Sequence, residues 1–145
     1  MNKYLIKFSK IGNMKYISHL DLMNVFQRVF RRAGIQLVYS QGFSPHPKIS
    51  IAHPLSLGIE SIGEYMEFEL VNHWDTQELL LTLNKQLPKG IGIMACKEIV
   101  KKIKSLAAEV RYAAYDLSFS KQGLDSDEIK NAIQAYLNMD EIIVI

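Results

Sequence analysis

The stretch from Tyr39 to Pro54, YSQGFSPHPKISIAHP, limits what this chain can fold into more than any other part of the sequence. Pro45 and Pro47 have no backbone N–H, fix φ at about −65°, and push the residue before each of them toward extended backbone. Neither a helix nor a central strand tolerates two prolines at this spacing. The sequence therefore predicts a stiff, open loop over residues 43–48, which is either a plain hairpin connection or a binding loop.

Two helices flank this loop, and each is predicted from its caps and its apolar spacing. In the first helix Ser18 is the predicted N-cap, Asp21 lies at the third helical position, and Gly34 ends the helix. In the second helix Asp75 is the predicted N-cap, and Pro88 stops the helix. Apolar residues recur every three or four positions in both, so each helix is expected to bury one face.

The segments around the helices alternate apolar and polar residues, as half-buried strands do. Strands are predicted over residues 3–10, 36–40, 48–52, 64–71 and 91–100. The order of strands and helices predicts an α+β fold with a ferredoxin-like (split βαβ) antiparallel sheet and both helices on one face. This domain is expected to cover residues 1–104, and a different α+β sandwich is the alternative architecture.

The rest of the chain, residues 105–145, begins a second pattern after a predicted linker, KKIK, at 101–104. A strand is predicted over 110–119, a helix from Asp125 or Ser126 through Tyr136, and a strand over Glu141–Ile145. The last strand is apolar and nothing polar follows it, so we expect a partial second βαβ unit, shortened or unusually paired. An open apolar edge favours pairing with another chain, which predicts a homo-oligomer through Glu141–Ile145.

The charge of the chain is unevenly distributed. Residues 1–50 carry a formal charge of +7 and the remaining residues carry −5, which gives the net +2. A basic N-terminal third that contains the proline loop indicates an anionic partner, with nucleic acid favoured over a membrane. A solvated basic face is the alternative interpretation.

Composition also bounds the cellular class and the cofactors. No apolar run approaches the ~18–20 residues of a membrane helix, and the N-terminus has no signal-peptide core, so a cytoplasmic protein without membrane contact is expected. The single cysteine, Cys96, excludes an internal disulfide, an iron–sulfur cluster held by this chain alone and a cysteine-rich zinc site. Four dispersed histidines add too few ligands for a metal, so no metal and no cofactor are expected.

Catalytic motifs are not recognisable, whereas residues suited to nucleic acid are present. There is no Ser-His-Asp order with a nucleophile elbow, no GxGxxG motif and no P-loop, and Cys96 lies within an apolar strand. Lys7, Arg28, Arg31 and Lys48 supply charge for phosphates. Tyr16, Tyr39 and Phe43 are suited to stacking on unpaired bases, and Gly42 permits a close backbone approach.

A single site is predicted where the start of the first helix meets the proline loop. A five-residue strand over 36–40 would return the chain to the helix N-terminus, whose free N–H groups suit a phosphate. The residues expected to cluster there are Ser18, His19, Asp21, Gln41, His46 and Lys48, and Arg28 and Phe43 complete the candidate binding set. Arg31 and Arg32 are expected at the far end of the helix.

The runs ISHLD, RRAG, YSQGF, PHPKIS and GEY occur in this order, and LNKQLPKGI follows them. With these motifs the chain closely resembles the radical-SAM-linked family, also called the domain of unknown function 2344, over at least residues 3–100 and more loosely to 145. PLSLGIES stands here where members often have PLPLGVES. Members of that family occur fused to, or encoded beside, a B12-binding-type radical SAM protein, and they are commonly longer. The resemblance therefore implies a radical SAM partner rather than a reaction, and no catalytic residue is carried over.

Three hypotheses about function follow. The first is a non-catalytic accessory module that presents RNA or another anionic substrate to a B12-type radical SAM enzyme. The second is a protein-interaction domain that docks this partner without nucleic acid. The third is a metal-independent endoribonuclease that uses His46 or His53 as acid or base.

Overall fold

The computed structural model describes residues 2–100, 106–118, 120, 123 and 125–139. The chain divides into two compact units, residues 1–112 and 113–145. The short helix α3 (Leu106–Glu109) belongs to the first of these units. The predicted linker at 101–104 lies outside the described residues.

A four-stranded antiparallel sheet forms the centre of the first unit. Its strands are β1 (Asn2–Lys10), β2 (Ile49–Ile51), β3 (Ser61–Leu70) and β4 (Ile91–Glu98), in the order β2-β3-β1-β4. Every neighbouring pair is antiparallel. The α+β class and the antiparallel sheet are as predicted, and the strand order agrees with the split βαβ plan.

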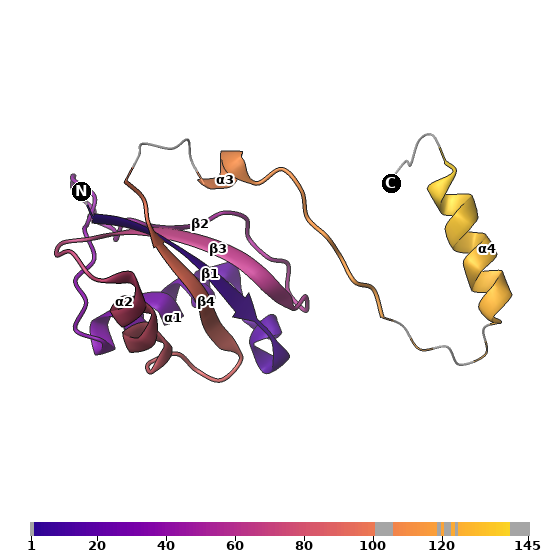
Figure 1. Cartoon of the computed structure of the whole chain (residues 1–145), viewed down its shortest axis with the longest axis horizontal. Helices are drawn as coiled ribbons and strands as arrows, with labels where there is room; N and C mark the ends of the chain where they lie inside the picture. The colour runs from indigo at the N-terminus through magenta and orange to yellow at the C-terminus, as the bar shows by residue number, and fades with distance from the viewer. Residues whose placement is uncertain (1, 101–105, 119, 121–122, 124, 140–145) are drawn as a thin grey trace. The chain divides into compact units, whose positions relative to one another are not determined.

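Both long helices of this unit, α1 (His19–Arg32) and α2 (Thr76–Asn84), contribute to one core with the sheet (Figure 1). Alternate residues of β1 point into this core, because side chains of a strand alternate between the two faces. Phe8 stands edge-on to Phe26 at 5.0 Å between ring centroids, and Phe30 packs edge-on against Phe68 at 4.7 Å. All four rings are buried.

Both helices begin at the N-caps that the sequence predicts, and α1 ends at the predicted glycine. The backbone N–H of Asp21 donates to Ser18 Oγ at 3.1 Å, and two N–H groups of the first turn of α2 donate to Asp75 Oδ1. Gly34 has φ +70°, and the N–H of Ile35 donates to the carbonyl of Phe30 at 3.0 Å. This pattern is the Schellman motif, which satisfies the last carbonyls of α1 and turns the chain sharply.

The predicted strand over residues 36–40 is wrong. Only isolated bridges form there, between Leu37 and Leu70 and between Tyr39 and Pro47. The N–H of Val38 donates to the carbonyl of Glu69, and the chain then turns out of the sheet. The returning segment supplies the edge strand, which is only three residues long. The sheet therefore has four strands where the sequence predicts five.

The second unit contains helix α4 (Ser126–Leu137), as the sequence predicts. Residues 110–118 form no strand, so that part of the predicted second βαβ unit is wrong. An extended segment needs a partner for its N–H and C=O groups, and no described strand pairs with this one. The strand and the self-association predicted for Glu141–Ile145 lie outside the described residues.

A close backbone contact holds the end of the sheet where β1 leads into the 3-10 helix η1 (Gly12–Tyr16). The N–H of Ile11 donates to the carbonyl of Gly90 at 2.8 Å, and Gly90 has φ +99°. A Cβ at Gly90 would lie 2.6 Å from the carbonyl oxygen of Ile11 and 2.7 Å from Met14 Cγ. Only glycine fits this position without displacing η1.

The outer edge of β4 is joined to α2 by a side chain. Asn84 Nδ2 donates to the carbonyl of Ile93 and Asn84 Oδ1 accepts from the N–H of Ile93, both at 2.9 Å. The carboxamide thus takes the place of a neighbouring strand at this residue. Within the described residues, no helix is long and apolar enough to cross a membrane.

Candidate binding site

The structure does not bring the predicted site residues together. Ser18 lies beside the end of β1, because Lys10 Nζ donates to the carbonyl of Ile17 at 3.0 Å. Lys48 lies beside its beginning, since Lys48 Nζ is 2.9 Å from Glu69 Oε2 and Glu69 pairs in register with Lys3. These two positions are separated by most of β1, roughly 23 Å at ~3.3 Å per residue.

The predicted cluster therefore divides into two groups at opposite ends of the sheet. Ser18, His19 and Asp21 begin α1, whereas Gln41, His46 and Lys48 belong to the proline loop at the end where α1 finishes. The cluster is wrong because it depended on a full strand over 36–40 running back along the helix. The chain instead leaves the sheet after Val38, so the loop and Arg31 are at the same end.

The proline loop is a hairpin whose tip is exposed, in agreement with the open loop that the two prolines predict. Ser40 and His46 close it, since the N–H of Ser40 donates to the carbonyl of His46 at 2.8 Å and the N–H of His46 donates to Ser40 Oγ at 3.1 Å. Ser40 Oγ also lies 3.0 Å from His46 Nδ1. Residues 41–46 are all exposed, and Phe43 is fully exposed.

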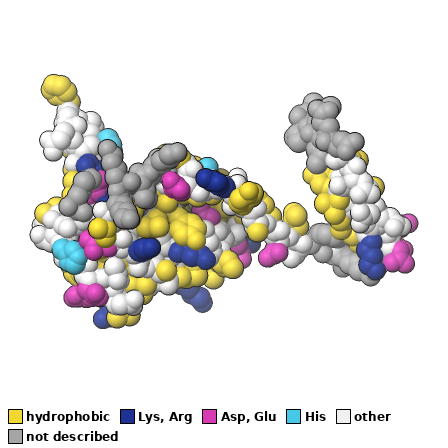
Figure 2. All heavy atoms as spheres, turned by 45° about the horizontal axis from the view of Figure 1, so that its top comes forward, with side chains coloured by type: hydrophobic (Ala, Val, Ile, Leu, Met, Phe, Trp, Pro, Cys, Tyr) yellow, Lys and Arg dark blue, Asp and Glu magenta, His cyan; other side chains and the backbone are white. Residues whose placement is uncertain are grey.

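Much of the basic excess of the N-terminal third is already occupied within the protein. Three lysines pair with carboxylates, namely Lys3 with Glu67, Lys15 with Glu60 and Lys48 with Glu69. Lys10 and Arg32 instead donate to backbone carbonyls, those of Ile17 and Gln86. In Figure 2, Lys and Arg side chains lie among acidic and hydrophobic ones rather than in a patch of one sign.

Arg28 and Arg31 differ from these side chains. Both are exposed on α1, and neither pairs with a carboxylate of the part of the chain that the structure describes. Because they are not neutralised internally, their charges are available to a ligand. Arg28 is one of the predicted site residues, whereas Arg31 is not.

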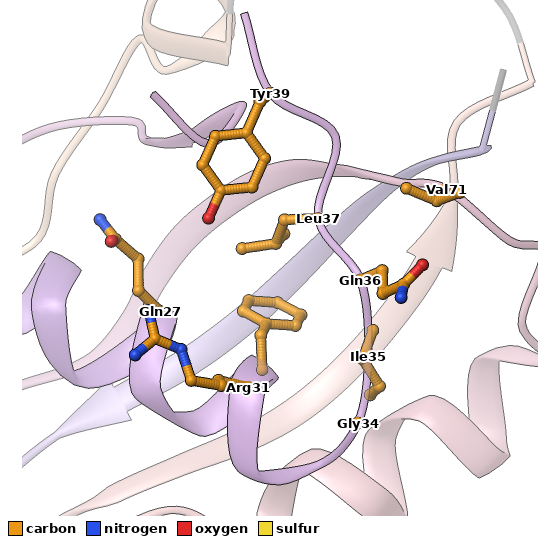
Figure 3. Close-up of a pocket in the computed structure, with 9 residues that line it drawn as sticks. Gln27, Arg31, Gly34, Ile35, Gln36, Leu37, Tyr39 and Val71 are labelled. Carbon is orange, nitrogen blue, oxygen red and sulfur yellow. The ribbon is translucent and has the colours of Figure 1, made fainter. Parts of the chain in front are cut away.

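Arg31 lines a pocket of about 450 Å³ between the end of α1 and the segment that follows it (Figure 3). The Schellman turn at Gly34 brings this segment back against the helix. The apolar part of the lining includes Phe30, Ile35 and Leu37, and the polar part consists of Gln27, Arg31, Gln36 and Tyr39. In Figure 3 the side chains of Gln27, Arg31 and Tyr39 lie around that of Leu37, while Gln36 points toward the Val71 side.

No carboxylate is present in that lining. A smaller hollow of about 180 Å³ lies beside His46 and Lys48, but Glu67 and Glu69 also line it. Lys3 and Lys48 pair with these two glutamates, so the charges in the smaller hollow offset each other. The pocket at Arg31 is therefore the better place for an anion.

This pocket lies at the opposite end of α1 from the predicted cluster. Its lining includes Gln27 and Gln36, which are not among the predicted site residues, and Arg31, which is predicted only as a charge for phosphates. One available signal was the spacing of Gln27 and Arg31, which are four residues apart and therefore share a helix face. A second was Gly34, since a glycine in a Schellman turn sends the following residues back over the last turn of the helix. Tyr39 was recognised as a stacking residue, but not as a neighbour of Arg31.

Cys96 is expected to be a slowly reacting thiol. Burial raises its pKa from 9.0 to about 11, and the negative charge of Asp75 adds to the effect. The thiolate is the nucleophile, so alkylation at pH 8 should be about 100-fold slower in the native protein than in urea. Because the folded-state pKa is the higher one, the free energy of unfolding should be unaffected by this group below pH 9 and fall between pH 9 and about 11. Equal alkylation rates in the two states would contradict this.

Metal-binding groups are not assembled in the described residues, where no three His, Cys, Asp or Glu side chains lie close enough to hold an ion.

A family model described as an uncharacterised protein conserved in bacteria, the domain of unknown function 2344 (DUF2344), matches residues 3–145. The chain therefore belongs to this family. No curated protein matches the sequence.

Proposed function

We propose that this member of the DUF2344 family is a non-catalytic, cytoplasmic accessory module that holds RNA or another anionic substrate for a B12-type radical SAM enzyme. The observation that carries the binding part is the pocket beside Arg31, which has a cation at its rim and no carboxylate in its lining. The proposed enzyme partner rests on the sequence resemblance described above, with its ISHLD, YSQGF and PHPKIS motifs.

Electrostatics at this end of the molecule make Arg31 the decisive group. The pocket lies at the C-terminal end of α1, where the helix dipole is negative and repels anions. An anion therefore depends on the guanidinium groups there, and a guanidinium can donate two parallel hydrogen bonds to a phosphate. Arg32 is occupied by the carbonyl of Gln86 at 2.6 Å, which leaves Arg31 as the group at the pocket rim.

The catalytic alternative has less support in the geometry. His46 contacts Ser40 in the hairpin, and no carboxylate orients its ring among the described residues. His53 is exposed beyond the end of β2. Mass analysis of RNA after incubation with the protein tests this alternative directly, since cleavage products would show an endoribonuclease.

The expected result for Arg31→Ala is a loss of RNA affinity of about tenfold at low salt, because one charge-assisted contact is removed. The slope of log affinity against log salt should also fall by about one. Fluorescence anisotropy with a labelled RNA at two salt concentrations measures both quantities. Lys48→Ala and His46→Ala should have smaller effects, since Lys48 is already paired with Glu69.

Lys89→Ala is the matched control for lost charge. Lys89 is exposed and precedes Gly90, which contacts the other end of the sheet at Ile11. Equal losses for Arg31→Ala and Lys89→Ala would mean that RNA responds only to net charge, and would remove the assigned site. If the protein binds no RNA and still co-purifies with the radical SAM protein, the docking hypothesis replaces this proposal.

A further inference from the structure

We infer that the pocket beside Arg31 takes one unpaired nucleotide, so that the ligand is single-stranded rather than double-stranded RNA; this inference rests on the proposed function. The pocket combines one cation with an apolar lining and several neutral polar side chains. A phosphate requires only the cation. The remaining groups match a flat, partly apolar ligand with hydrogen-bonding edges, as a nucleobase is.

The apolar lining provides a surface for the face of a base. Leu37 is half-buried and packs against the core, which contains the almost completely buried Phe30. The exposed part of Leu37 is therefore held in place from beneath. Tyr39 is 48% exposed and presents its ring beside Leu37 (Figure 3). Stacking on an aromatic ring contributes to affinity for any base, because every base has a π-face.

Polar groups beside this surface match the edge of a base. The side-chain amide of Gln27 can donate hydrogen bonds through its NH₂ group and accept them through its oxygen. The hydroxyl of Tyr39 can also donate and accept. In Figure 3 these two side chains and Arg31 lie around Leu37, so a base stacked on Leu37 would lie among an amide, a hydroxyl and a guanidinium group. A volume of about 450 Å³ is within the usual range for small-ligand sites, about 300–1,000 Å³.

A paired base does not fit this arrangement. In an RNA duplex the Watson–Crick edges are used by pairing, and the major groove is too deep and narrow for side chains to read. A base must therefore be unpaired to bring its face and edge into a hollow of this kind. The duplex would be left with phosphate contacts alone.

Phe43 supplies an independent second observation. A fully exposed phenylalanine at the tip of a hairpin is costly in water, and the hairpin is closed by several hydrogen bonds between Ser40 and His46. Tyr39, where the hairpin begins, lines the pocket. The tip thus offers a second stacking surface on the same segment, which suits a further base of the same single strand.

The test compares three RNA probes of one length on the full chain by anisotropy. They are a single strand, the same strand annealed into a blunt duplex, and an abasic oligomer that supplies phosphates without bases. The single strand should bind at least about tenfold more tightly than the other two, the difference expected for stacking of one or more bases. Gln27→Glu, which introduces a carboxylate at nearly constant volume, should weaken single-strand binding by about tenfold.

Phe43→Ala should lower affinity for the single strand by about tenfold and leave duplex binding unchanged. Leu57→Ala is the matched control, because Leu57 is also an exposed apolar residue but lies next to Gly58, which contacts Lys15 near the start of α1.

Equal affinity for the single strand, the duplex and the abasic oligomer would overturn this inference while leaving RNA binding intact. Identical affinities for Phe43→Ala and Leu57→Ala would overturn the second stacking surface. Absence of binding to every probe would instead refute the proposed function itself.

Discussion

Gly90→Ala is expected to lower the free energy of unfolding by about 3 kcal/mol or more, the largest effect predicted for a change this small. Two costs add at this position. The backbone has φ +99°, which a residue with a Cβ rarely adopts, and the new methyl would lie 2.6 Å from the carbonyl oxygen of Ile11. The carbonyl belongs to the backbone, so it cannot move aside as the end of a flexible side chain can.

Gly58→Ala separates the cost of the positive φ from the cost of the steric clash. Gly58 also has a positive φ, +82°, but no atom lies within 4 Å of a Cβ built there. It should therefore lose only the conformational term, about 1–2 kcal/mol. Urea denaturation followed by circular dichroism measures both variants against the wild type. Equal losses would show that the contact with Ile11 relaxes without cost.

Phe26→Ala is expected to cost about 3–5 kcal/mol, enough to unfold a domain of ordinary stability in part. Phe26 is fully buried and stands edge-on to Phe8 at 5.0 Å between ring centroids. Removing the ring leaves a cavity between α1 and the central strand, and the surrounding side chains can fill it only partly.

Phe43→Ala is the matched control for this loss, since it removes the same ring from a fully exposed position. Its free energy of unfolding should stay within about 0.5 kcal/mol of the wild type. The same pair of variants should show the opposite order in RNA binding per folded molecule. A similar loss of stability in both variants would contradict the assignment of Phe26 to the core.

The parts of the fold that depend on neighbours in sequence were predictable. Ser18 and Asp75 cap their helices with their own side chains, and Gly34 ends α1 through its own backbone, so each can be recognised within a few residues. The alternation of β1 similarly identifies its buried face. The order of the elements then favours an antiparallel split βαβ sheet, although it does not exclude another α+β sandwich.

Strand pairing was less predictable, because it depends on residues far apart in the chain. Residues 36–40 have the alternation of a strand, but β3 gives them only the bridge at Leu37 before the returning edge strand pairs with it instead. Residues 110–118 also alternate, and no described strand pairs with them. Periodicity identifies segments that could pair, whereas the partner decides whether they do.

The predicted cluster of site residues does not form, for the same reason. Its predicted position required the loop to travel the length of α1, and one missing strand moved the loop to the other end. The residue types were more informative than their positions, since arginine, glutamine and tyrosine near the helix and the loop were visible in the sequence. Which of them share a pocket depends on the turn at Gly34 and on the ion pairs that occupy Lys3 and Lys48.

The carboxamide of Asn84 also has a consequence for protein at high concentration. An uncovered edge strand is a template on which a strand of another molecule can add, and this is a common route to fibrous aggregates. At Ile93 both backbone groups are already bound by Asn84, so an added strand would have to displace two hydrogen bonds before gaining its own. One helical side chain thus protects β4 against sheet extension without a charge or a proline at that residue.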